Sequence, residues 1–520
     1  MTPYLLSHLI DSAAERDPAH TALKIGDQAM SYGELAARSA KLAAAIGETR
    51  LSSGQPIGVY AFKALDTVVA IHAIQRAGAI TVPIDPMAPP AQVSRMTSSL
   101  GLRGLVVDDA HASRIAGTQH PPVIITNAVT DGIDAEIVTS ADIEASQPVS
   151  AASILADDPA YMITTSGSTG EPKAIVHTHR SAMRYAQLAA ATYALRSDDR
   201  LANVAPFHFD QSTFELYASL VARATSVMVP EAFLRFPAEL SKLAESERLT
   251  VWYSVPTILT QLLHRGALDD HDLSSLRWVL FGGERFGAGT LGQLMRRLPT
   301  ARFSNVYGPA EVNQCTHHHL TRPPEADQSI PIGAPWADTE VRVVEPNSRT
   351  LPKIELDRGE LVVRSATMMA GYWNRQDLTE GSMLAEHDSS GIRRRWYRTG
   401  DLVERDDNGL LHFLGRVDRQ VKVRGARVEL EYVESALADV DGVISAAAVT
   451  VMKNSEQQLI AVLETDGSVA PRTVMAAVRD VLPPHAVPSD VVIVDRLPRT
   501  QSGKIDSRAA ADAYLEQVDQ

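Results

Sequence analysis

The sequence is poor in cysteine, in long apolar runs and in positive charge. Its one cysteine, Cys315, excludes intramolecular disulfides and makes a cysteine-based metal site unexpected. No run of about 18 apolar residues is present, and residues 1–17 contain Ser, His, Asp and Glu where a secretion signal would be apolar. The net charge of −14 argues against non-specific nucleic-acid binding. We therefore expect a cytoplasmic protein without a membrane span.

The chain has the size and the pattern of a large α/β protein. Its 520 residues are enough for two or more domains with large cores. Residues 55–85, QPIGVYAFKALDTVVAIHAIQRAGAITVPID, predict a strand, a helix and a strand. These strands are continuously apolar, which is typical of a parallel sheet covered on both faces. LTVWYSVPTILTQLL and LRWVLFGGER repeat the pattern, so we predict an α/β fold with doubly wound sheets.

The pattern of predicted secondary structure changes twice toward the C-terminus. From about residue 330 the strands are shorter and separated by Gly and Pro, as in EVRVVEP and GELVVRS. Near residue 418 a hairpin and an amphipathic helix begin, and a small α+β unit follows. We place a domain boundary at Asp418, which gives domains of residues 1–417 and 418–520.

A loop rich in hydroxyl groups and glycine follows the apolar strand AYMI, in AYMITTSGSTGEPKAIVHTH (residues 160–179). Gly167 and Gly170 let the main chain approach a ligand closely. Lys173 adds a cation. Further hydroxyl donors come from Thr164, Thr165, Ser166, Ser168 and Thr169. Such a concavity binds anionic oxygens, and a polyphosphate is the expected ligand.

Two other interpretations of this loop fit less well. The common phosphate-binding loop has Gly-Lys-Ser/Thr, whereas Gly170 is followed by Glu171-Pro172-Lys173. A flexible Ser/Gly linker is the second alternative, but linkers do not usually join two segments that both have the pattern of buried strands.

Further motifs accompany this loop along nearly the whole chain. In order they are SYGELAARSAKLA, RAGAITVPID, NVAPFHFDQSTFE, NVYGPAEVNQCT, GELVVRS, MMAGYW, YRTGDLVERDDNGLLHFLGRVDRQVKVRG and PRTQSGKIDSRA. This series resembles the adenylate-forming superfamily, which comprises acyl-CoA synthetases, firefly luciferase and the adenylation domains of non-ribosomal peptide synthetases. The resemblance implies a large N-terminal domain that includes a small distorted β-barrel, and a mobile C-terminal domain that turns about Asp418.

The resemblance also implies a reaction in two steps. A carboxylate first attacks the α-phosphate of ATP, giving an acyl-adenylate and pyrophosphate; a thiol then attacks the acyl carbon and releases AMP. The loop after AYMI would hold the β- and γ-phosphates. Glu311 would hold Mg²⁺, which prefers oxygen ligands. Tyr307 would stack on adenine, and Asp401 would bind the ribose hydroxyls with help from Arg416.

The complete expected nucleotide site is larger. It comprises Thr165, Ser166, Gly167, Ser168, Thr169, Gly170, Lys173, Gly282, Gly283, Glu284, Asn305, Val306, Tyr307, Gly308, Ala310, Asp401, Phe413 and Arg416. Ala310 departs from the family pattern, which usually has Thr there, so one hydroxyl contact to the α-phosphate is missing.

Lys504 of TQSGKID is the expected catalytic cation, and His208 is assigned to catalysis with it. Substitution at phosphorus leaves the protein mainly electrostatic work, so a cation should bridge the attacking carboxylate and the α-phosphate. A solvated C-terminal lysine is the alternative for this segment taken alone.

Asp210 of PFHFDQSTFE indicates the class of acid. In family members that activate amino acids, an Asp at this place pairs with the α-ammonium of the substrate, and a buried carboxylate needs such a cationic partner. Capping of the following helix is the alternative role for Asp210. The matched substrate residues are Asp210, Gln211, Phe214, Tyr253, Leu280, Gly282, Val306, Gln314 and Cys315. Bulky Phe214 and Tyr253 favour a small neutral amino acid, such as alanine, serine or glycine; proline is also compatible.

The second substrate is expected to be a carrier-protein thiol. No Ser-bearing carrier domain follows Lys504, so we expect a stand-alone ligase that acts on a separate phosphopantetheinylated carrier protein, with Gly425 lining the thiol tunnel. Natural-product assembly or cell-wall D-alanylation would be its setting. An acyl- or aryl-CoA synthetase is the alternative, and a catalytically silent binding protein would require loss of Lys504, Glu311 or Asp401.

Three consecutive histidines, 317–319, could suggest a metal site. They cannot all face one metal ion in regular structure, so we do not expect one there.

Overall fold

The computed structural model describes residues 3–128, 131–165, 172–326, 328–348, 350–351, 355–387, 390–417, 420–423, 425–453, 456–499 and 505–518. The chain forms two compact units. The larger unit takes in Met1–Pro86, Leu100–Thr164 and Ala174–Val417. The smaller unit takes in Met87–Ser99, Thr165–Lys173 and Asp418–Gln520. Each unit is considered by itself below.

Two large sheets form most of the larger unit. The nine-stranded sheet has the order β16 (Ala334–Pro335), β15 (Thr316–Leu320), β14 (Arg302–Tyr307), β13 (Trp278–Gly282), β12 (Val251–Ser254), β10 (Arg200–Asn203), β11 (Thr225–Met228), β1 (Thr21–Ile25) and β2 (Gln28–Ser31). The eight-stranded sheet has the order β19 (Gly371–Tyr372), β9 (Lys173–Thr178), β8 (Pro159–Thr165), β4 (Ile80–Pro83), β3 (Pro56–Tyr60), β5 (Gly104–Val107), β6 (Val123–Ile125) and β7 (Glu136–Val138). The central strands of both pair in parallel, as their continuous apolar runs predict.

Helices separate and cover these strands. They are α1 (Leu6–Arg16), α2 (Tyr32–Glu48), α3 (Leu65–Arg76), α5 (Asp109–Ile115), α6 (Ser140–Ala145), α7 (His179–Thr192), the π-helix η1 (Phe214–Ala218), α8 (Ser219–Ala222), α9 (Pro237–Ser246), α10 (Pro256–Arg265), α11 (Ala288–Arg297) and α12 (Gln376–Gly381). Helix α4 (Pro90–Leu100) belongs almost wholly to the smaller unit. Short 3₁₀ helices are η2 (Glu231–Arg235), η3 (Leu268–Asp270) and η4 (Ala310–Val312). The strand, helix and strand predicted for residues 55–85 are β3, α3 and β4.

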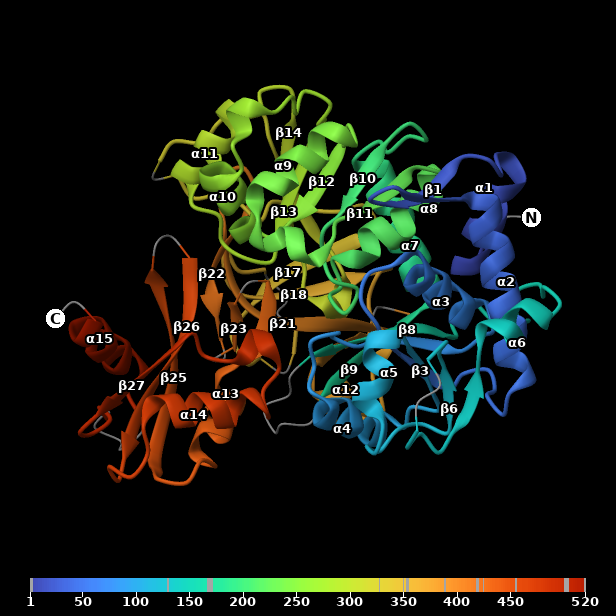
Figure 1. Cartoon of the computed structure of the whole chain (residues 1–520). Helices are drawn as coiled ribbons and strands as arrows, with labels where there is room; N and C mark the ends of the chain where they lie inside the picture. The colour runs from blue at the N-terminus through green and yellow to red at the C-terminus, as the bar shows by residue number, and fades with distance from the viewer. Residues whose placement is uncertain are drawn as a thin grey trace. The chain divides into compact units, whose positions relative to one another are not determined.

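The nine-stranded sheet is buried on both faces. Trp252, Val279 and Phe281 pack into a core with α9, α10 and α11, which lie together over β12–β14 in Figure 1. The alternate residues Tyr253 and Leu280 pack on the other side with α7 and η1. Successive side chains of a strand point to opposite faces, so an unbroken apolar run fills both cores.

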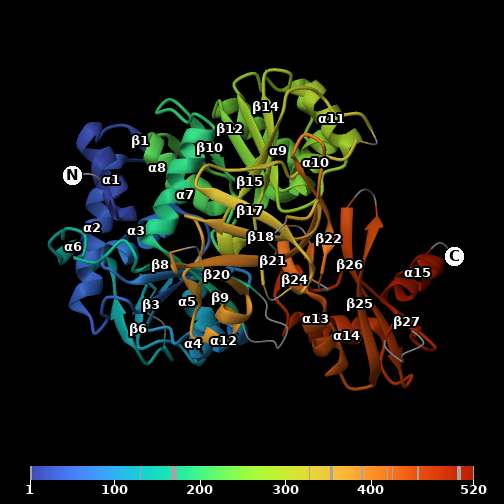
Figure 2. The ribbon, with the colours of Figure 1, turned by 180° about the vertical axis from the view of Figure 1, so that it is seen from behind.

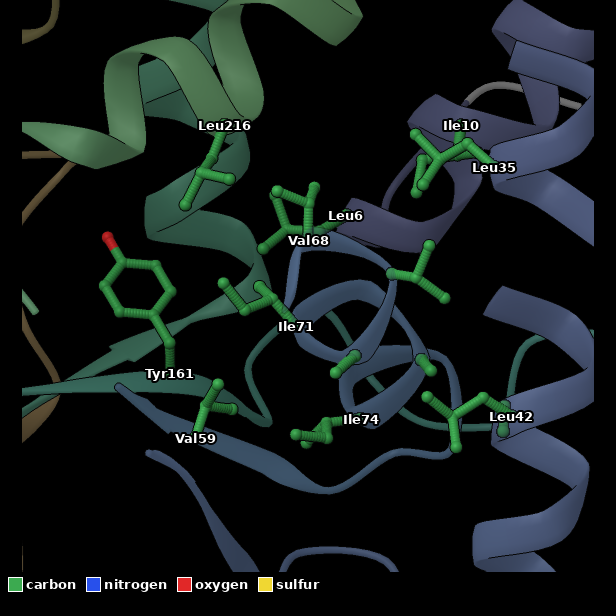
Figure 3. Close-up of a cluster of buried hydrophobic side chains, with 14 of the residues drawn as sticks. Leu6, Ile10, Leu35, Leu42, Val59, Val68, Ile71, Ile74, Tyr161 and Leu216 are labelled. Atoms are coloured by element: carbon green, nitrogen blue, oxygen red, sulfur yellow. The ribbon is translucent and has the colours of Figure 1, made fainter. Parts of the chain in front are cut away.

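The eight-stranded sheet packs on helices α1, α2 and α3. Figure 3 shows Ile71 and Ile74 of α3 between Tyr161 of β8, Val59 of β3 and Leu42 of α2, and all five side chains belong to one buried cluster. Helix α2 begins with a capping box, in which Ser31 and Glu34 satisfy each other's main-chain N–H groups.

A five-stranded antiparallel sheet completes the larger unit. Strands β17 (Thr339–Val344), β18 (Arg358–Ser365), β21 (Arg393–Arg405) and β20 (Met383–His387) form it, with β22 (Leu411–Arg416) also paired to β21. Figure 2 shows β17, β18 and β21 side by side. This sheet is the part of the larger unit for which the distorted barrel was expected.

The smaller unit is an α+β unit, as predicted. Its strands are β23 (Gln420–Val423), β24 (Ala426–Glu429), β25 (Val443–Lys453), β26 (Glu456–Thr465) and β27 (Asp490–Val494), and its C-terminal helices are α13 (Leu430–Ala438), α14 (Pro471–Arg479), η5 (Pro484–Ala486) and α15 (Ser507–Val518). Ala446 and Ala448 of β25 pack with α13 and α14, whereas Ala447 and Val449 pack with α15. Among the described residues, no helix combines the length and the apolar character needed to cross a bilayer.

Candidate active site

The carboxyl ends of β13 and β14 bring the segments FGGER and NVYGPAE together. Gly282 pairs with Val306, and a Cβ atom on Gly282 would lie 2.2 Å from the Val306 carbonyl oxygen. A Cβ atom on Gly308 would lie 2.3 Å from the carbonyl oxygen of Asn313. Both positions therefore require glycine, because neighbouring main chain occupies the space of a side chain. These strand ends are where ligands of parallel α/β sheets bind.

Tyr307, Asp401 and Arg416 form one hydrogen-bonded row. The Tyr307 hydroxyl donates to Asp401 Oδ2 at 2.5 Å, and Arg416 donates to Asp401 Oδ1 across the paired strands β21 and β22. Tyr307 and Asp401 are both buried. Burial, and then the charge of Asp401, raises the pKa of Tyr307 well above its ordinary value. Three side chains expected at the adenosine are thus held in place by one another.

Glu311, the expected metal ligand, is buried on η4. Its Oε1 accepts a hydrogen bond of 2.7 Å from the hydroxyl of Tyr372. Next to it, His177 Nε2 lies 2.8 Å from the Ala310 carbonyl oxygen. Burial lowers the pKa of His177 to about 4, so the ring is neutral at pH 7 and donates through Nε2–H. The PAE segment is therefore fixed from two sides.

Two side chains of the FGGER segment, Glu284 and Arg285, bond to residues outside it. The Thr257 hydroxyl donates to Glu284 Oε2 at 2.7 Å. Arg285 donates to the carbonyl oxygens of Phe413 and Leu414, at 3.1 and 2.7 Å, and its guanidinium lies 5.1 Å from the Phe413 ring centroid. Phe413 thus lies beside the residues expected to form the adenine wall. Asn305 donates from Nδ2 to the Pro331 carbonyl oxygen at 2.7 Å.

Asp210 lies in a turn just before the π-helix η1. It is half-buried, and the Thr213 hydroxyl donates to its carbonyl oxygen at 2.6 Å. The helix that contains η1 begins at Ser212, so Asp210 lies two residues before its first residue. Phe214, the first residue of η1, is fully buried and meets the Tyr253 ring edge-to-face at 5.6 Å. A π-helix is rare and often marks a functional site.

Two glutamine side chains meet at the Tyr253 hydroxyl. Gln314 Nε2 donates to it at 2.8 Å, and Gln211 is also hydrogen-bonded to it. Burial, and then the charge of Asp210, raises the pKa of Tyr253 well above its ordinary value. The other expected substrate residues with side chains are all buried: Leu280, Val306 and Cys315.

His208 belongs to a half-buried cluster of titratable groups. Its Nε2 lies 3.9 Å from Asp85 Oδ2. Burial lowers the pKa of His208, an effect that Asp85 opposes. Lys63 Nζ donates to the carbonyl and side-chain oxygens of Asn203, both at 2.8 Å, and burial lowers the pKa of Lys63 to about 7.

The smaller unit holds part of the expected phosphate site. Lys173 Nζ lies 2.5 Å from Glu429 Oε1, which also accepts from Gln420 Nε2 at 3.2 Å. Thr165 is the last residue of β8, and Gly425 precedes β24 with a φ of +81°. Seven predicted residues lie outside the described residues: Ser166, Gly167, Ser168, Thr169, Gly170, Asp418 and Lys504.

The three histidines of β15 do not form a metal site. The His317 and His319 ring centroids are 4.7 Å apart, and burial lowers the pKa of His317 to about 4. No group of three or more His, Cys, Asp or Glu side chains in the described part of the chain is arranged to hold a metal ion.

Comparison with known families identifies the class of the protein. The family model of the AMP-binding enzyme matches residues 10–373, and that of the AMP-binding enzyme C-terminal domain matches residues 432–504. The chain belongs to the AMP-binding enzymes. It is an ATP-using, adenylate-forming ligase, as its motifs predicted.

Several curated AMP-binding enzymes are similar over nearly the whole chain. L-proline--[L-prolyl-carrier protein] ligase from Pseudomonas fluorescens is 30% identical over 98% of this chain and 99% of its own length. Tyrocidine synthase 3 from Brevibacillus parabrevis is 31% identical, and gramicidin S synthase 2 from Brevibacillus brevis is 29% identical, each over 97% of this chain. The chain spans only 8% and 11% of the lengths of these two synthases.

Solved structures of AMP-binding enzymes share the fold. The amide bond synthetase McbA from Marinactinospora thermotolerans superimposes with a TM-score of 0.85 at 24% identity, covering 98% of this chain and 99% of its own. The adenylation domain AlmE of Vibrio cholerae, in complex with glycyl-adenosine-5'-phosphate, gives a TM-score of 0.84 at 24% identity, covering 99% and 98%. At this identity the likeness concerns the fold.

Some residues that shape this site were not predicted. Tyr372 lies in the quoted motif MMAGYW and His177 in AIVHTH, yet neither was assigned a role. Only the folded chain brings them to Glu311 and Ala310, which lie more than 60 and 130 residues away. Glu215 of DQSTFE is fully buried, and neither of its carboxylate oxygens has a hydrogen-bond partner in the described residues. Burial raises the pKa of Glu215 well above its ordinary value.

Proposed function

We propose that this enzyme activates a small neutral amino acid and transfers it to the phosphopantetheine thiol of a carrier protein. In the first step an amino-acid carboxylate oxygen attacks the α-phosphorus of ATP, and the bond to pyrophosphate breaks. In the second step the thiolate attacks the acyl carbon, and the bond to AMP breaks. Similarity to the proline–carrier protein ligase and to two peptide antibiotic synthases supports this assignment and a role in natural-product assembly.

The position of Asp210 carries the amino-acid assignment. Its carboxylate lies close enough to the buried phenols of Tyr161, Tyr185 and Tyr253 to contribute to the raised pKa of each, after burial itself. A carboxylate beside these buried aromatic rings is a suitable counter-charge for a cation brought by the substrate. The α-ammonium of an amino acid is such a cation, whereas fatty and aryl acids have none.

The nucleotide end would position ATP for this attack. We assign the adenine to the ring of Tyr307 and to the opposite segment 282–284, and the ribose to Asp401 and Arg416. Glu311 fits a magnesium site, because Mg²⁺ is usually held by one or two carboxylates together with the substrate phosphates. When bound, Mg²⁺ would neutralise charge on the phosphates. Lys504 is proposed to balance the charge that develops at the α-phosphate.

ATP–pyrophosphate exchange over the full set of amino acids tests this proposal. We expect exchange with one or a few small neutral amino acids. Lys504→Ala should lower the exchange rate by about 100-fold or more, in the range found when one transition-state contact is lost. Exchange with a fatty or aryl acid and with no amino acid would overturn the amino-acid assignment.

Asp210→Asn isolates the charge that the proposal needs. Exchange should fall about 100-fold or more, while ATP binding measured by calorimetry stays close to wild type. Asp109→Asn, at an exposed position of α5, is the matched control and should leave both unchanged.

Loading of a phosphopantetheinylated carrier protein, followed by mass spectrometry, tests the second step. Product formed with free CoA alone would favour a CoA synthetase instead.

A further inference from the structure

The amide of Gln314 has only one of its two ends bonded. Its Nε2 donates to the Tyr253 hydroxyl at 2.8 Å, and the residue is 5% exposed. The other end, Oε1, is buried and has no hydrogen-bond partner among the described residues. Folded proteins leave few buried polar atoms in this state, so each one needs an explanation. A partner supplied by the substrate is one.

This amide lies near the group proposed to hold the substrate amine. The phenol of Tyr253 accepts a hydrogen bond from Gln314, and the charge of Asp210 contributes to its raised pKa. Gln314 and Asp210 therefore both act on the same aromatic side chain. Phe214 packs edge-to-face on the same ring and limits the room beyond it. With its ammonium paired to Asp210, an amino acid could extend a short side chain past Tyr253 toward Gln314.

The chemistry of an amide end selects the side chain that can satisfy it. Depending on how the group is turned, the free end of Gln314 offers an acceptor oxygen or two N–H donors. A hydroxyl group both donates and accepts, so it satisfies either arrangement. An ammonium only donates, a carboxylate only accepts, and a methyl group does neither.

We infer that the substrate is a short amino acid with a side-chain hydroxyl, serine or threonine, and that Gln314 selects it through a hydrogen bond to that hydroxyl. This inference rests on the proposed function and narrows it. Alanine and glycine, which the size of the surrounding residues also allows, would leave the Gln314 amide unsatisfied. Sites built to bond a substrate hydroxyl discriminate strongly against analogues that lack it.

Pairs of amino acids that differ in the hydroxyl test this directly. ATP–pyrophosphate exchange is measured for serine against alanine, for threonine against valine, and for glycine and proline. The better hydroxyl substrate should exceed its partner by about 100-fold or more in kcat/KM. Equal or greater kcat/KM for alanine, valine, glycine or proline would overturn the inference while leaving the proposed function intact. If no amino acid supports exchange, the proposed function itself fails.

Substitution of Gln314 ties the preference to this side chain. Gln314→Leu should reduce the ratio between the paired substrates to less than about tenfold, mainly through the KM of the hydroxyl substrate. Tyr253→Phe keeps the ring packing but removes the group that holds the amide, and it should reduce the ratio as well. Gln293→Leu, on the exposed side of α11, is the matched control and should leave the ratio unchanged. A ratio unchanged in both site variants, with thermal melting confirming that they fold, would overturn the inference.

Discussion

The two ends of the candidate site differ in how their polar groups are bonded. At the nucleotide end, Asp401 accepts hydrogen bonds from Tyr307 and Arg416, and Glu311 accepts one from Tyr372. At the amino-acid end, Gln314 keeps one amide atom without a partner in the described residues. The chain itself fixes the groups that would meet ATP, and it leaves a bond to be made where the acid would bind. Side chains that are already held in place suit ATP, because every reaction cycle uses the same nucleotide.

Asp401→Leu should have the largest effect on stability, because it removes the central residue of the hydrogen-bonded row formed by Tyr307, Asp401 and Arg416. It removes the carboxylate to which the buried Tyr307 hydroxyl and the Arg416 guanidinium both donate, which should lower the free energy of unfolding by about 3–5 kcal/mol. Urea unfolding followed by tryptophan fluorescence measures this loss. Asp377→Leu is the matched control: its ion pair with Arg375 is at the surface, and its loss should cost less than about 1 kcal/mol. Equal losses in the two variants would contradict the comparison.

His177→Gln should change how stability depends on pH. The ring of His177 stays neutral in the folded protein down to a pKa of about 4, whereas in the unfolded chain it is protonated below about 6.5. Between these values the unfolded state binds the extra proton, so acid favours unfolding and stability falls as the pH falls.

At pH 5 this contribution is at most about 2 kcal/mol, and His177→Gln should remove it. Urea unfolding at pH 7.5 and at pH 5 measures the difference for wild type and variant. His264→Gln, at an exposed position of α10, is the control and should keep the wild-type difference. A wild-type difference retained in His177→Gln would show that this ring does not titrate as described.

Gly282→Ala should strain the contact between Gly282 and Val306, two residues that were assigned to both the nucleotide site and the amino-acid site. Its methyl group would meet the Val306 carbonyl oxygen at 2.2 Å, and the required shift should cost about 1–3 kcal/mol. Gly289→Ala in helix α11 makes the same chemical change in open space, where the nearest atom is 3.9 Å away, and it should stabilise by up to about 1 kcal/mol. Thermal melting compares the two, and shifts of the same sign would show that this contact tolerates a methyl group.

Gln314→Leu should have the smallest effect on stability, within about 1 kcal/mol of wild type, because the amide makes only part of its possible hydrogen bonds. The same variant is expected to have the greatest effect on the choice of substrate. Urea unfolding beside the exchange assay separates the two properties. A loss of stability as large as that of Asp401→Leu would mean that Gln314 is a structural residue. The nucleotide end and the amino-acid end of the site would then not differ in how their polar groups support the fold.

Much of the fold could be predicted from local patterns. Residues 55–85 form the predicted strand, helix and strand, and the predicted hairpin and amphipathic helix are β23, β24 and α13. These elements follow from apolar periodicity and turn residues, which act over a few positions. The helix expected over STFELYASL forms over residues 212–222, but its middle turn is the π-helix η1, and no local signal in that segment predicts this turn.

The candidate site could be predicted only as a set of motifs. Tyr307, Asp401 and Arg416 were expected to share a ligand, but the bond between Tyr307 and Asp401 joins residues 94 positions apart, which no local pattern shows. The role of Tyr372 beside Glu311 was missed for the same reason. Lys504 and the loop at 166–170 lie outside the described residues, so their roles stay predictions.

The class of this enzyme and most of its secondary structure follow from the order of its residues, because motifs and apolar patterns are properties of neighbouring positions. The tertiary structure alone decided which polar atoms are paired and which are left free. Pairing depends on atoms meeting within about 3 Å across the fold, and only the packed chain sets those distances. Asp401 and Gln314 show the two outcomes, the first bonded within the protein and the second with an amide atom still to be matched.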